Sequence, residues 1–180
     1  MNLSTERLTL RRWRPEDRDL FAVINADARV HEHLPGPMTR EDSDAMADRI
    51  EAHFEKHNFG LWAVELHDGP SFAGFVGLSI PRFEASFTPC VEIGWRLSTD
   101  VWGQGIATEA ARLALRYGFD VLQLKEILSF TVPDNHASRR VMEKIGMSHD
   151  PADDFDHPLF PVEHRLSRHV LYRIQRKDSG

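Results

Sequence analysis

The chain has 180 residues, 41% of them hydrophobic, and this size and composition suit one globular domain over residues 1–180. Its formal net charge of −6 argues against nucleic acid as a partner, because Lys and Arg must neutralise phosphates in such binding, and it suits a cationic ligand better. One cysteine, Cys90, excludes an internal disulfide, and no apolar run reaches the roughly 18 residues of a membrane span. We therefore expect a cytoplasmic protein with no membrane partner.

The N-terminal half carries the patterns of strands and helices in turn. Alternation of apolar and polar residues predicts the strands, and apolar stripes behind a proline or the Thr39 cap predict the helices. Two prolines around Gly36 predict a loop over residues 28–39. Trp62 and Phe75 fit core positions better than ligand stacking. In chain order, the predicted elements are a strand over 7–11, a helix from 15 to about 25, a helix from 39 to about 58, and strands over 61–66 and 72–80.

Residues 90–109 hold the most informative pattern of the chain. A period of two predicts a strand with distinct faces. One face carries Val91, Ile93, Trp95 and Leu97. Gly103 and Gly105 follow; they remove Cβ atoms that would keep an anion off the main chain, and the helix that starts behind them directs free N–H groups at the same gap. This is the pattern of a phosphate site, although a tight connection uses the same glycines.

The C-terminal half continues with a helix, a strand and another helix. A strand, a helix and a strand in this order imply a right-handed crossover, and hence parallel pairing of the two strands. Gly118 weakens the end of the first helix, and Asn135 caps the second. The predicted elements are a helix from 106 to about 118, a strand over 126–132, a helix over 136–145, an acidic irregular segment over 151–161 and a final strand over 169–175.

The glycine turn differs from two widespread phosphate loops. No Lys-Ser/Thr pair follows Gly105, which argues against a P-loop, and the third glycine of the dinucleotide fingerprint is missing. Residues 102–107 instead resemble the acyl-CoA loop of the GNAT acetyltransferases, Gln/Arg-x-x-Gly-x-Gly/Ala, with Trp102 in place of the usual Gln or Arg. As a block, WGQGIATEA is similar to the RimJ/RimL-like branch, which contains the ribosomal-protein N-terminal acetyltransferases.

A second motif carries the same resemblance. The run from Asn135 to Ser138, followed by Lys144 and Gly146-Met147, resembles the Asn-x-x-Ser helix and the Lys-x-Gly-Phe ending of that branch, with Met for Phe. The two motifs stand in the expected order and spacing. The resemblance covers the chain from about residue 5 to residue 173.

The resemblance implies both a fold and an activity. The fold is α/β, with a GNAT-like mixed, mostly antiparallel sheet of about seven strands flanked by about four helices. The activity is acetyl-CoA-dependent transfer of an acetyl group to a primary amine, which is a protein N-terminal α-amine or a small-molecule amine. A non-catalytic module that binds or senses acyl-CoA stays open as the alternative. We expect a monomer or a homodimer and no metal site.

The family pattern also implies which residues hold the cofactor. The glycine turn and the helix start would meet the pyrophosphate, and Asn135 would contact the pantetheine arm. The cofactor-binding residues expected in this way are Trp95, Leu97, Trp102, Gly103, Gln104, Gly105, Ile106, Ala107, Thr108, Asn135 and Ser138.

Three residues are candidates for the chemistry. An ammonium group must lose a proton before it attacks, and Glu92, a carboxylate in an apolar strand beside the turn, is the candidate base. Its alternative role is a strand glutamate paired with an arginine of a neighbouring strand. The resemblance implies that the Leu97 N–H stabilises the oxyanion and that Ser138 protonates the leaving thiolate. The alternative for Ser138 is a first-turn serine that satisfies backbone amides.

Other groups have two interpretations each. Arg139 and Arg140 would meet the cofactor's phosphates or lie solvated on the surface. His53 and His57 share a helix face, but the position of Glu55 between them argues against a metalloprotease site. Two further sets of residues, four histidines and four aspartates, would either draw an amine toward the acceptor entrance or remain solvated. These are the histidines His31, His33, His157 and His164, and the acidic residues Asp150, Asp153, Asp154 and Asp156.

Overall fold

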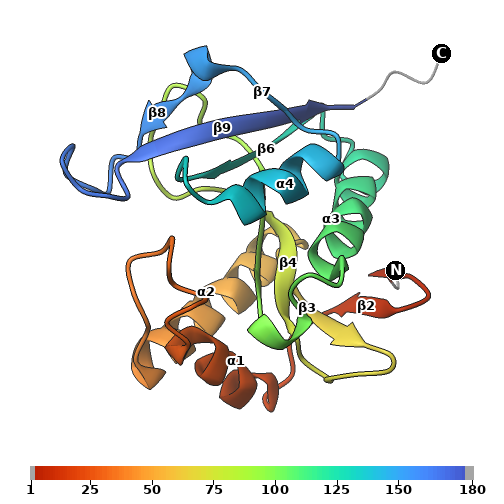
Figure 1. Cartoon of the computed structure of the whole chain (residues 1–180). Helices are drawn as coiled ribbons and strands as arrows, with labels where there is room; N and C mark the ends of the chain where they lie inside the picture. The colour runs from red at the N-terminus through yellow and green to blue at the C-terminus, as the bar shows by residue number, and fades with distance from the viewer. Residues whose placement is uncertain (1–2, 177–180) are drawn as a thin grey trace.

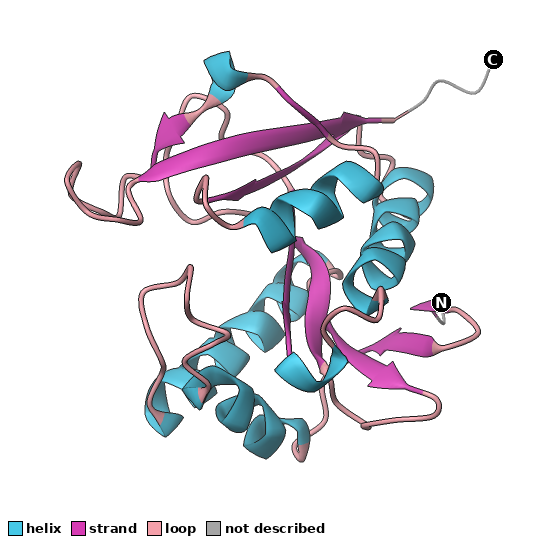
Figure 2. Ribbon diagram, in the orientation of Figure 1, coloured by secondary structure: helices cyan, strands magenta, loops and turns pink. Residues whose placement is uncertain are grey.

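The computed structural model describes residues 3–176 and shows a mixed sheet with helices packed on both faces (Figures 1 and 2). The nine strands follow the order β1-β2-β3-β4-β5-β6-β9-β7, with β8 paired to β9. Every pairing is antiparallel except that of β5 with β6. The strands are β1 (Leu3–Ser4), β2 (Leu8–Arg11), β3 (Leu61–Leu66), β4 (Gly74–Ser79), β5 (Glu92–Leu97), β6 (Glu126–Thr131), β7 (Ser148–His149), β8 (Phe155–Asp156) and β9 (Arg168–Gln175).

Four α-helices flank the sheet. They are α1 (Asp17–Ala26), α2 (Arg40–His57), α3 (Ile106–Arg116) and α4 (His136–Lys144). Phe21 of α1 packs edge-on against Phe75 of β4, which places α1 on one face of the sheet. Residues 117–121, which continue α3 as a π-helical turn, lie on the other face, where a Cβ on Gly118 would stand 2.6 Å from Ile127 and 3.1 Å from Leu78. Within residues 3–176, no helix is long and apolar enough to cross a membrane.

The local signals in the sequence act as predicted at both ends of α2. The Thr39 hydroxyl accepts a hydrogen bond from the Asp42 N–H at 3.1 Å, which satisfies one of the free amides of the first turn. Asn58 ends the helix in the left-handed conformation, with φ of 60°. The helix buries Ala47, Ile50 and Phe54 against the core.

The sheet opens between its two parallel strands. β5 and β6 are paired in register only at Glu92 and Leu128, and beyond that point the Ser129 hydroxyl donates to the Ile93 carbonyl at 2.9 Å in place of a ladder bond. In Figure 1, β6 and β9 accordingly lie in the upper part of the molecule and β2 to β4 in the lower part. Such an opening exposes main-chain groups that a continuous sheet would pair.

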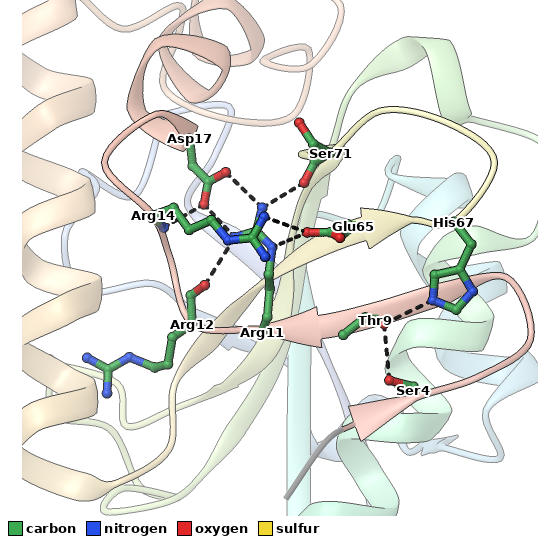
Figure 3. Close-up of polar contacts among 9 residues, drawn as sticks. All are labelled: Ser4, Thr9, Arg11, Arg12, Arg14, Asp17, Glu65, His67 and Ser71. Atoms are coloured by element: carbon green, nitrogen blue, oxygen red, sulfur yellow. Dashed lines mark hydrogen bonds and ion pairs between the residues drawn. The ribbon is translucent and has the colours of Figure 1, made fainter.

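A buried ion-pair network ties the first strands to α1 (Figure 3). Arg11 donates to both carboxylate oxygens of Asp17, at 2.7 and 2.9 Å, and to the Ser71 carbonyl at 2.7 Å. Its Nε also donates to Glu65 of β3. Asp17 is only 1% exposed, and the hydrogen bonds that Arg11 donates to it are the main cause that raises the pKa of Arg11. The network therefore neutralises each of its buried charges with an opposite one.

The fold class predicted from the sequence is confirmed, as is the parallel pairing of β5 with β6. Trp62 and Phe75 lie in the core, as predicted. The strand count is higher than expected, because the two-residue strands β1, β7 and β8 were not predicted. The acidic segment after residue 150 is also more regular than predicted, since it holds the 3₁₀ turn Pro151–Asp153 and then β8.

Candidate active site

The glycine turn after β5 has the backbone shape that only glycine adopts easily. Gly103 and Gly105 have φ of 73° and 79°, in the left-handed region. A Cβ on Gly103 would meet no atom within 4 Å, so the turn faces open space. Gly105 is the N-cap of α3 and brings no side-chain cap, which leaves the first N–H groups of the helix free for an anion.

Two side chains of the turn bind the turn itself. The Trp102 indole donates from Nε1 to the Leu97 carbonyl at 3.0 Å, and Gln104 donates from Nε2 to the Asp100 carbonyl at 2.9 Å. Trp102 is nevertheless half exposed. In this chain, the residue that replaces the usual Gln or Arg thus joins the turn to the end of β5.

Main-chain groups of β5 face the opening beside β6. The Ser98 N–H bonds to Ala73 across from β4, and the register pairs Leu97 with Gly74. Because N–H groups alternate along a strand, the N–H of Leu97 points away from β4, and so do the main-chain groups of Trp95. Both residues were predicted to contact the cofactor, and their backbone is directed toward the opening.

The side chain of Trp95 reaches α4. Its Nε1 donates to the Ser138 hydroxyl at 3.3 Å. The cap of α4 is Asn135, whose Oδ1 accepts from the Ser138 N–H at 3.2 Å while Nδ2 donates to Thr131 Oγ1 at 2.9 Å. The alternative role of Ser138 as a cap for backbone amides is therefore wrong. Within residues 3–176 its hydroxyl has the Trp95 indole as its partner and keeps its own proton to donate.

Glu92 lies on the opposite face of β5 from Trp95. Its carboxylate accepts from the Ser79 hydroxyl at 2.9 Å, so its partner on the neighbouring strand is a serine, and the alternative of an arginine partner is wrong. Burial raises the pKa of Glu92 to about 7, against the opposing effect of the Ser79 hydrogen bond. A carboxyl with such a pKa exchanges protons near neutral pH, as a general base must.

The two candidate catalysts on β5 stand at its two ends. Glu92 and Leu97 are five residues apart, which is about 16 Å between Cα atoms in an extended strand. Gly94 lies between them on the face of Glu92, and a Cβ there would meet no atom within 4 Å. The face therefore has open space beside Glu92.

That same face borders a cavity of about 410 Å³. The loop over residues 28–39, the start of α2 and β5 enclose it. It is lined by His31, Pro35, Gly36, Pro37, Met38, Asp42, Met46, Arg49 and Arg96. Of the four loop histidines that the sequence suggested for an acceptor entrance, His31 is the one in this lining. Arg165 fixes the loop that forms part of this lining, because it donates to the Glu32 and Leu34 carbonyls at 3.0 and 2.7 Å.

A second cavity, of about 400 Å³, runs from the glycine turn along α3. Its lining is rich in basic residues, and the sequence patterns did not predict that these residues gather beside the turn. They are Arg7, Arg112, Arg116 and Lys144, beside Thr5, Gly105, Thr108 and Glu109. Arg7 forms an ion pair with Glu109 and donates to the Gln104 carbonyl at 3.1 Å. The spacing of residues 108, 112 and 116 at i, i+4 was the signal for this face.

Some of the residues for which the sequence left two roles open form hydrogen bonds within the fold. Arg139 donates to the Tyr172 hydroxyl at 3.2 Å and to the Pro133 carbonyl at 2.9 Å, whereas Arg140 is exposed. His53 uses both ring nitrogens, with the Phe59 carbonyl at 2.8 Å and the Ile80 N–H at 3.2 Å. These bonds hold Arg139 and His53 within the fold, and a contact of Arg139 or Arg140 with the cofactor's phosphates stays a prediction.

The acidic residues after position 149 are likewise paired. Asp153 accepts from Arg173 at 2.7 Å, and Asp154 is 2.7 Å from Nε2 of His149. Asp150 caps the following 3₁₀ turn, and Asp156 pairs with Arg168 at 3.4 Å. Asp150 and Asp156 are nevertheless exposed, as expected for solvated residues, whereas Asp153 and Asp154 are partly buried with their partners; a role in drawing an amine stays a prediction.

Comparison with known proteins agrees with this geometry. Residues 7–148 match the family model described as an acetyltransferase (GNAT) domain. An uncharacterized N-acetyltransferase of Bacillus subtilis, YnaD, is 30% identical over 148 residues, which are 82% of this chain and 82% of that protein. The chain belongs to the GNAT acetyltransferase family, whose activity is acetyl-CoA-dependent N-acetylation, as the resemblance implied.

Two solved structures share the fold. Ribosomal-protein-S5-alanine acetyltransferase from Vibrio fischeri has a TM-score of 0.76 at 17% identity, covering 99% of this chain and 98% of that one. Spermidine N-acetyltransferase from Vibrio cholerae, in complex with CoA and spermine, has a TM-score of 0.73 at 19% identity, covering 95% and 96%. The two proteins are named for different acceptors, so the shared fold leaves the acceptor of this chain to be inferred from its own residues.

Proposed function

We propose that this enzyme acetylates a small-molecule amine that enters from the Glu92 face of β5, while acetyl-CoA binds at the opening between β5 and β6. One observation carries the proposal: the opening begins after the pair of Glu92 with Leu128 and extends to the end of β5 that leads into the glycine turn, and the cavity of about 410 Å³ borders the other face of the same strand. A cavity of this size suits a small molecule. Acetyl-CoA and the amine would thus approach β5 from different sides and meet at its open edge.

The residues around the turn fit the cofactor. The left-handed glycines let a pyrophosphate approach the main chain, since a Cβ on Gly103 would meet no atom within 4 Å and one on Gly105 would meet only the end of the Arg7 side chain, at 3.7 Å; the uncapped N–H groups of α3 suit the charge. Main-chain groups of Trp95 would pair with the amides of the pantetheine arm, which would lie along the open edge of β5, and the Leu97 N–H would meet the acetyl group at the end of that arm. Coenzyme A bound in this way supplies the acetyl group as a thioester.

Asn135 needs a finer assignment than the sequence offered. Both polar atoms of its side chain already have partners, Ser138 N–H and Thr131 Oγ1. Its carbonyl oxygen has a second lone pair that can still accept a hydrogen bond from an amide. We therefore assign Asn135 chiefly to holding the first turn of α4, and with it Ser138, in place.

The proton steps divide between the two faces of β5. Glu92 would take the proton of the incoming ammonium, through water where the amine is not in direct contact. The amine nitrogen then forms its bond to the acetyl carbon as the carbon–sulfur bond breaks. The Leu97 N–H would stabilise the negative charge on the carbonyl oxygen, and Ser138 would give its proton to the departing sulfur.

Three broader assignments belong to the same proposal. A single domain over residues 1–180 is supported by the one continuous sheet of the described residues. The RimJ/RimL-like branch is supported by the block WGQGIATEA and by the fold shared with the Vibrio fischeri enzyme. A cytoplasmic location is supported by the single cysteine, whose pKa burial raises to about 11, as suits an unreactive thiol.

The test uses binding and turnover together. Free thiol is followed after mixing the protein with acetyl-CoA and a panel of amines, and CoA affinity is measured by calorimetry. Gly105→Val should weaken CoA binding by about tenfold or more, because its side chain would occupy the pyrophosphate's place. Gly146→Val is the matched control. Gly146 also has a positive φ, 91°, but it lies just past the C-terminal end of α4 and not in the glycine turn.

The outcomes separate the alternatives. Equal CoA affinity for the wild type and Gly105→Val would refute the cofactor assignment. CoA binding without thiol release from any amine would instead support the non-catalytic acyl-CoA module.

A further inference from the structure

Arg96 on β5 is a partly buried cation that faces no anion among residues 3–176. Its Nη1 donates to the Asn25 side-chain oxygen at 2.7 Å and lies 3.4 Å from the Met38 sulfur. Its guanidinium also stands 5.7 Å from the centre of the Phe75 ring. Within residues 3–176, no carboxylate lies within 4.0 Å of it. Burial lowers the pKa of Arg96 to about 10, so the group stays protonated at neutral pH.

A second polar group in the same cavity is also without a partner. His31 is 4% exposed, and neither of its ring nitrogens has a hydrogen-bond partner among the described residues. Burial is the main cause that lowers the pKa of His31, with the charge of Arg96 acting in the same direction. A neutral imidazole carries one N–H donor, which is available to a ligand.

The charge around the cavity is positive although the chain is acidic. Arg96 and Arg49 line it, against one carboxylate, Asp42. Asp42 lies exposed at the start of α2, where it accepts from the Thr39 hydroxyl at 3.0 Å and begins the helix. Buried donors inside and an engaged acid at the rim favour a negatively charged ligand.

We propose that the cavity binds a carboxylate of the acceptor through Arg96 and His31, so that the acceptor is a small amine that also carries a carboxylate group. This inference rests on the proposed function and adds its substrate class. Arg96 can offer a carboxylate two parallel N–H donors, which is the geometry that arginine provides best. His31 would add a third donor from the loop over residues 28–39.

The arrangement along β5 sets the orientation of such a substrate. Glu92, Gly94 and Arg96 alternate onto one face, and Gly94 leaves the space between the two charged side chains open. The carboxylate would lie at Arg96 in the cavity, and the ammonium would extend toward the opening where the thioester lies, with Glu92 reaching it through water. The Cα atoms of Glu92 and Arg96 are about 13 Å apart in an extended strand.

A purely structural role does not account for Arg96. Its bond to Asn25 requires one neutral N–H donor, which a glutamine would supply without burying a charge. An ionised group without a counter-ion is strongly disfavoured in the interior of a protein. The unmet charge therefore points to a ligand that brings the opposite one.

The experiment compares acids with their amides. The substrates are ω-amino acids of two to six carbons, each with its primary amide, which keeps the amine and removes the charge. For at least one chain length, kcat/KM of the wild type should be about tenfold or more higher for the acid, which is the worth of a hydrogen bond to a charged group. Arg96→Gln should abolish that preference by raising KM for the acid alone.

Controls separate this inference from the proposed function. Arg40→Gln removes an exposed arginine of α2 that pairs with Asp19 and Asp44, and it should keep the preference. Calorimetric binding of 5-acetamidopentanoate against its amide tests the cavity whether or not any amine reacts; tighter binding of the acid that Arg96→Gln loses supports the inference. Equal kcat/KM and equal binding of acid and amide in the wild type overturn it, while thiol release with both still supports the acetyltransferase.

Discussion

Arg11 and Arg96 are both largely buried arginines on strands, and they differ in what surrounds them. Arg11 meets two acidic side chains, Asp17 and Glu65, and its pKa is raised above the usual value, chiefly by the hydrogen bonds to Asp17. Arg96 meets an amide oxygen and two methionine sulfurs, and burial lowers its pKa to about 10. The pKa of Arg11 is raised because the fold supplies acidic partners, whereas the burial that lowers the pKa of Arg96 is not offset by an acidic partner within ion-pair distance among the described residues.

The difference separates a structural region from a functional one. The Arg11 network joins β2, α1 and β3, and its charges are all used within the protein. On β5, Glu92 has one hydroxyl partner and Arg96 has no acid within ion-pair distance among residues 3–176. Charges that the fold leaves unbalanced destabilise it, so their presence on one strand face indicates a binding site.

The largest expected effect tests this contrast directly. Arg11→Met should lower the free energy of unfolding by about 3 to 5 kcal/mol, because Asp17 would stay buried without its cation. Arg96→Met should lower it by only about 1 kcal/mol, because it leaves one neutral oxygen, that of the buried Asn25 side chain, without its donor but removes a charge that has no acidic partner among residues 3–176. Urea denaturation of both variants gives the comparison. A loss for Arg96→Met as large as that for Arg11→Met would show that Arg96 is structural.

The next effect concerns Glu92 and pH. Its pKa is about 7 in the folded protein against an ordinary value of 4.5, so the folded state holds the proton more tightly than the unfolded state. Stability from this group is fully present below pH 4.5 and is lost as the pH rises through 7. Glu92→Gln should therefore match the wild type near pH 4 and be more stable by about 3 kcal/mol near pH 8.

The same variant tests the catalytic role of Glu92. Near neutral pH, kcat/KM of Glu92→Gln should be depressed, and it should recover as the pH approaches the pKa of the free amine, since each pH unit gives about tenfold more neutral acceptor. Parallel pH profiles for the variant and the wild type would refute the assignment of the base.

The smallest expected effect concerns the Ser138 hydroxyl, an uncharged group on the cofactor side of β5. Ser138→Ala should lower turnover by about 10²-fold, because the hydroxyl that accepts from Trp95 still has its own proton to give to the thiolate. Ser148→Ala is the matched control, an exposed serine of β7. An unchanged rate for Ser138→Ala, with chemistry shown to limit turnover, would remove Ser138 from the mechanism.

Local signals account for the parts of the fold that were predicted. The Thr39 cap, the Asn135 cap and the period of two in β3 and β5 act between neighbours in the sequence, so they are visible there. The strands β1, β7 and β8 have two residues each, which is too short for any period. They form only because β2 or β9 lies beside them.

The site divides in the same way. The glycine turn was predictable because left-handed backbone is a local demand. Arg96 was not, because alternation assigns it to a face of β5 but does not reveal that α1, α2 and the loop over residues 28–39 bury that face. The net charge of −6 likewise suggested a cationic ligand, whereas the lining of the cavity is positive.

Arg165 has a consequence for attempts to change the substrate of this enzyme. It comes from the segment before β9, yet it holds the carbonyls of Glu32 and Leu34 in the loop that encloses the cavity. A chimera that takes residues 28–39 from a relative would lose this clamp unless the donor's loop presents its carbonyls to the same guanidinium. A chimera that is to keep the shape of this cavity should therefore exchange the two segments together, residues 28–39 and the segment that carries Arg165.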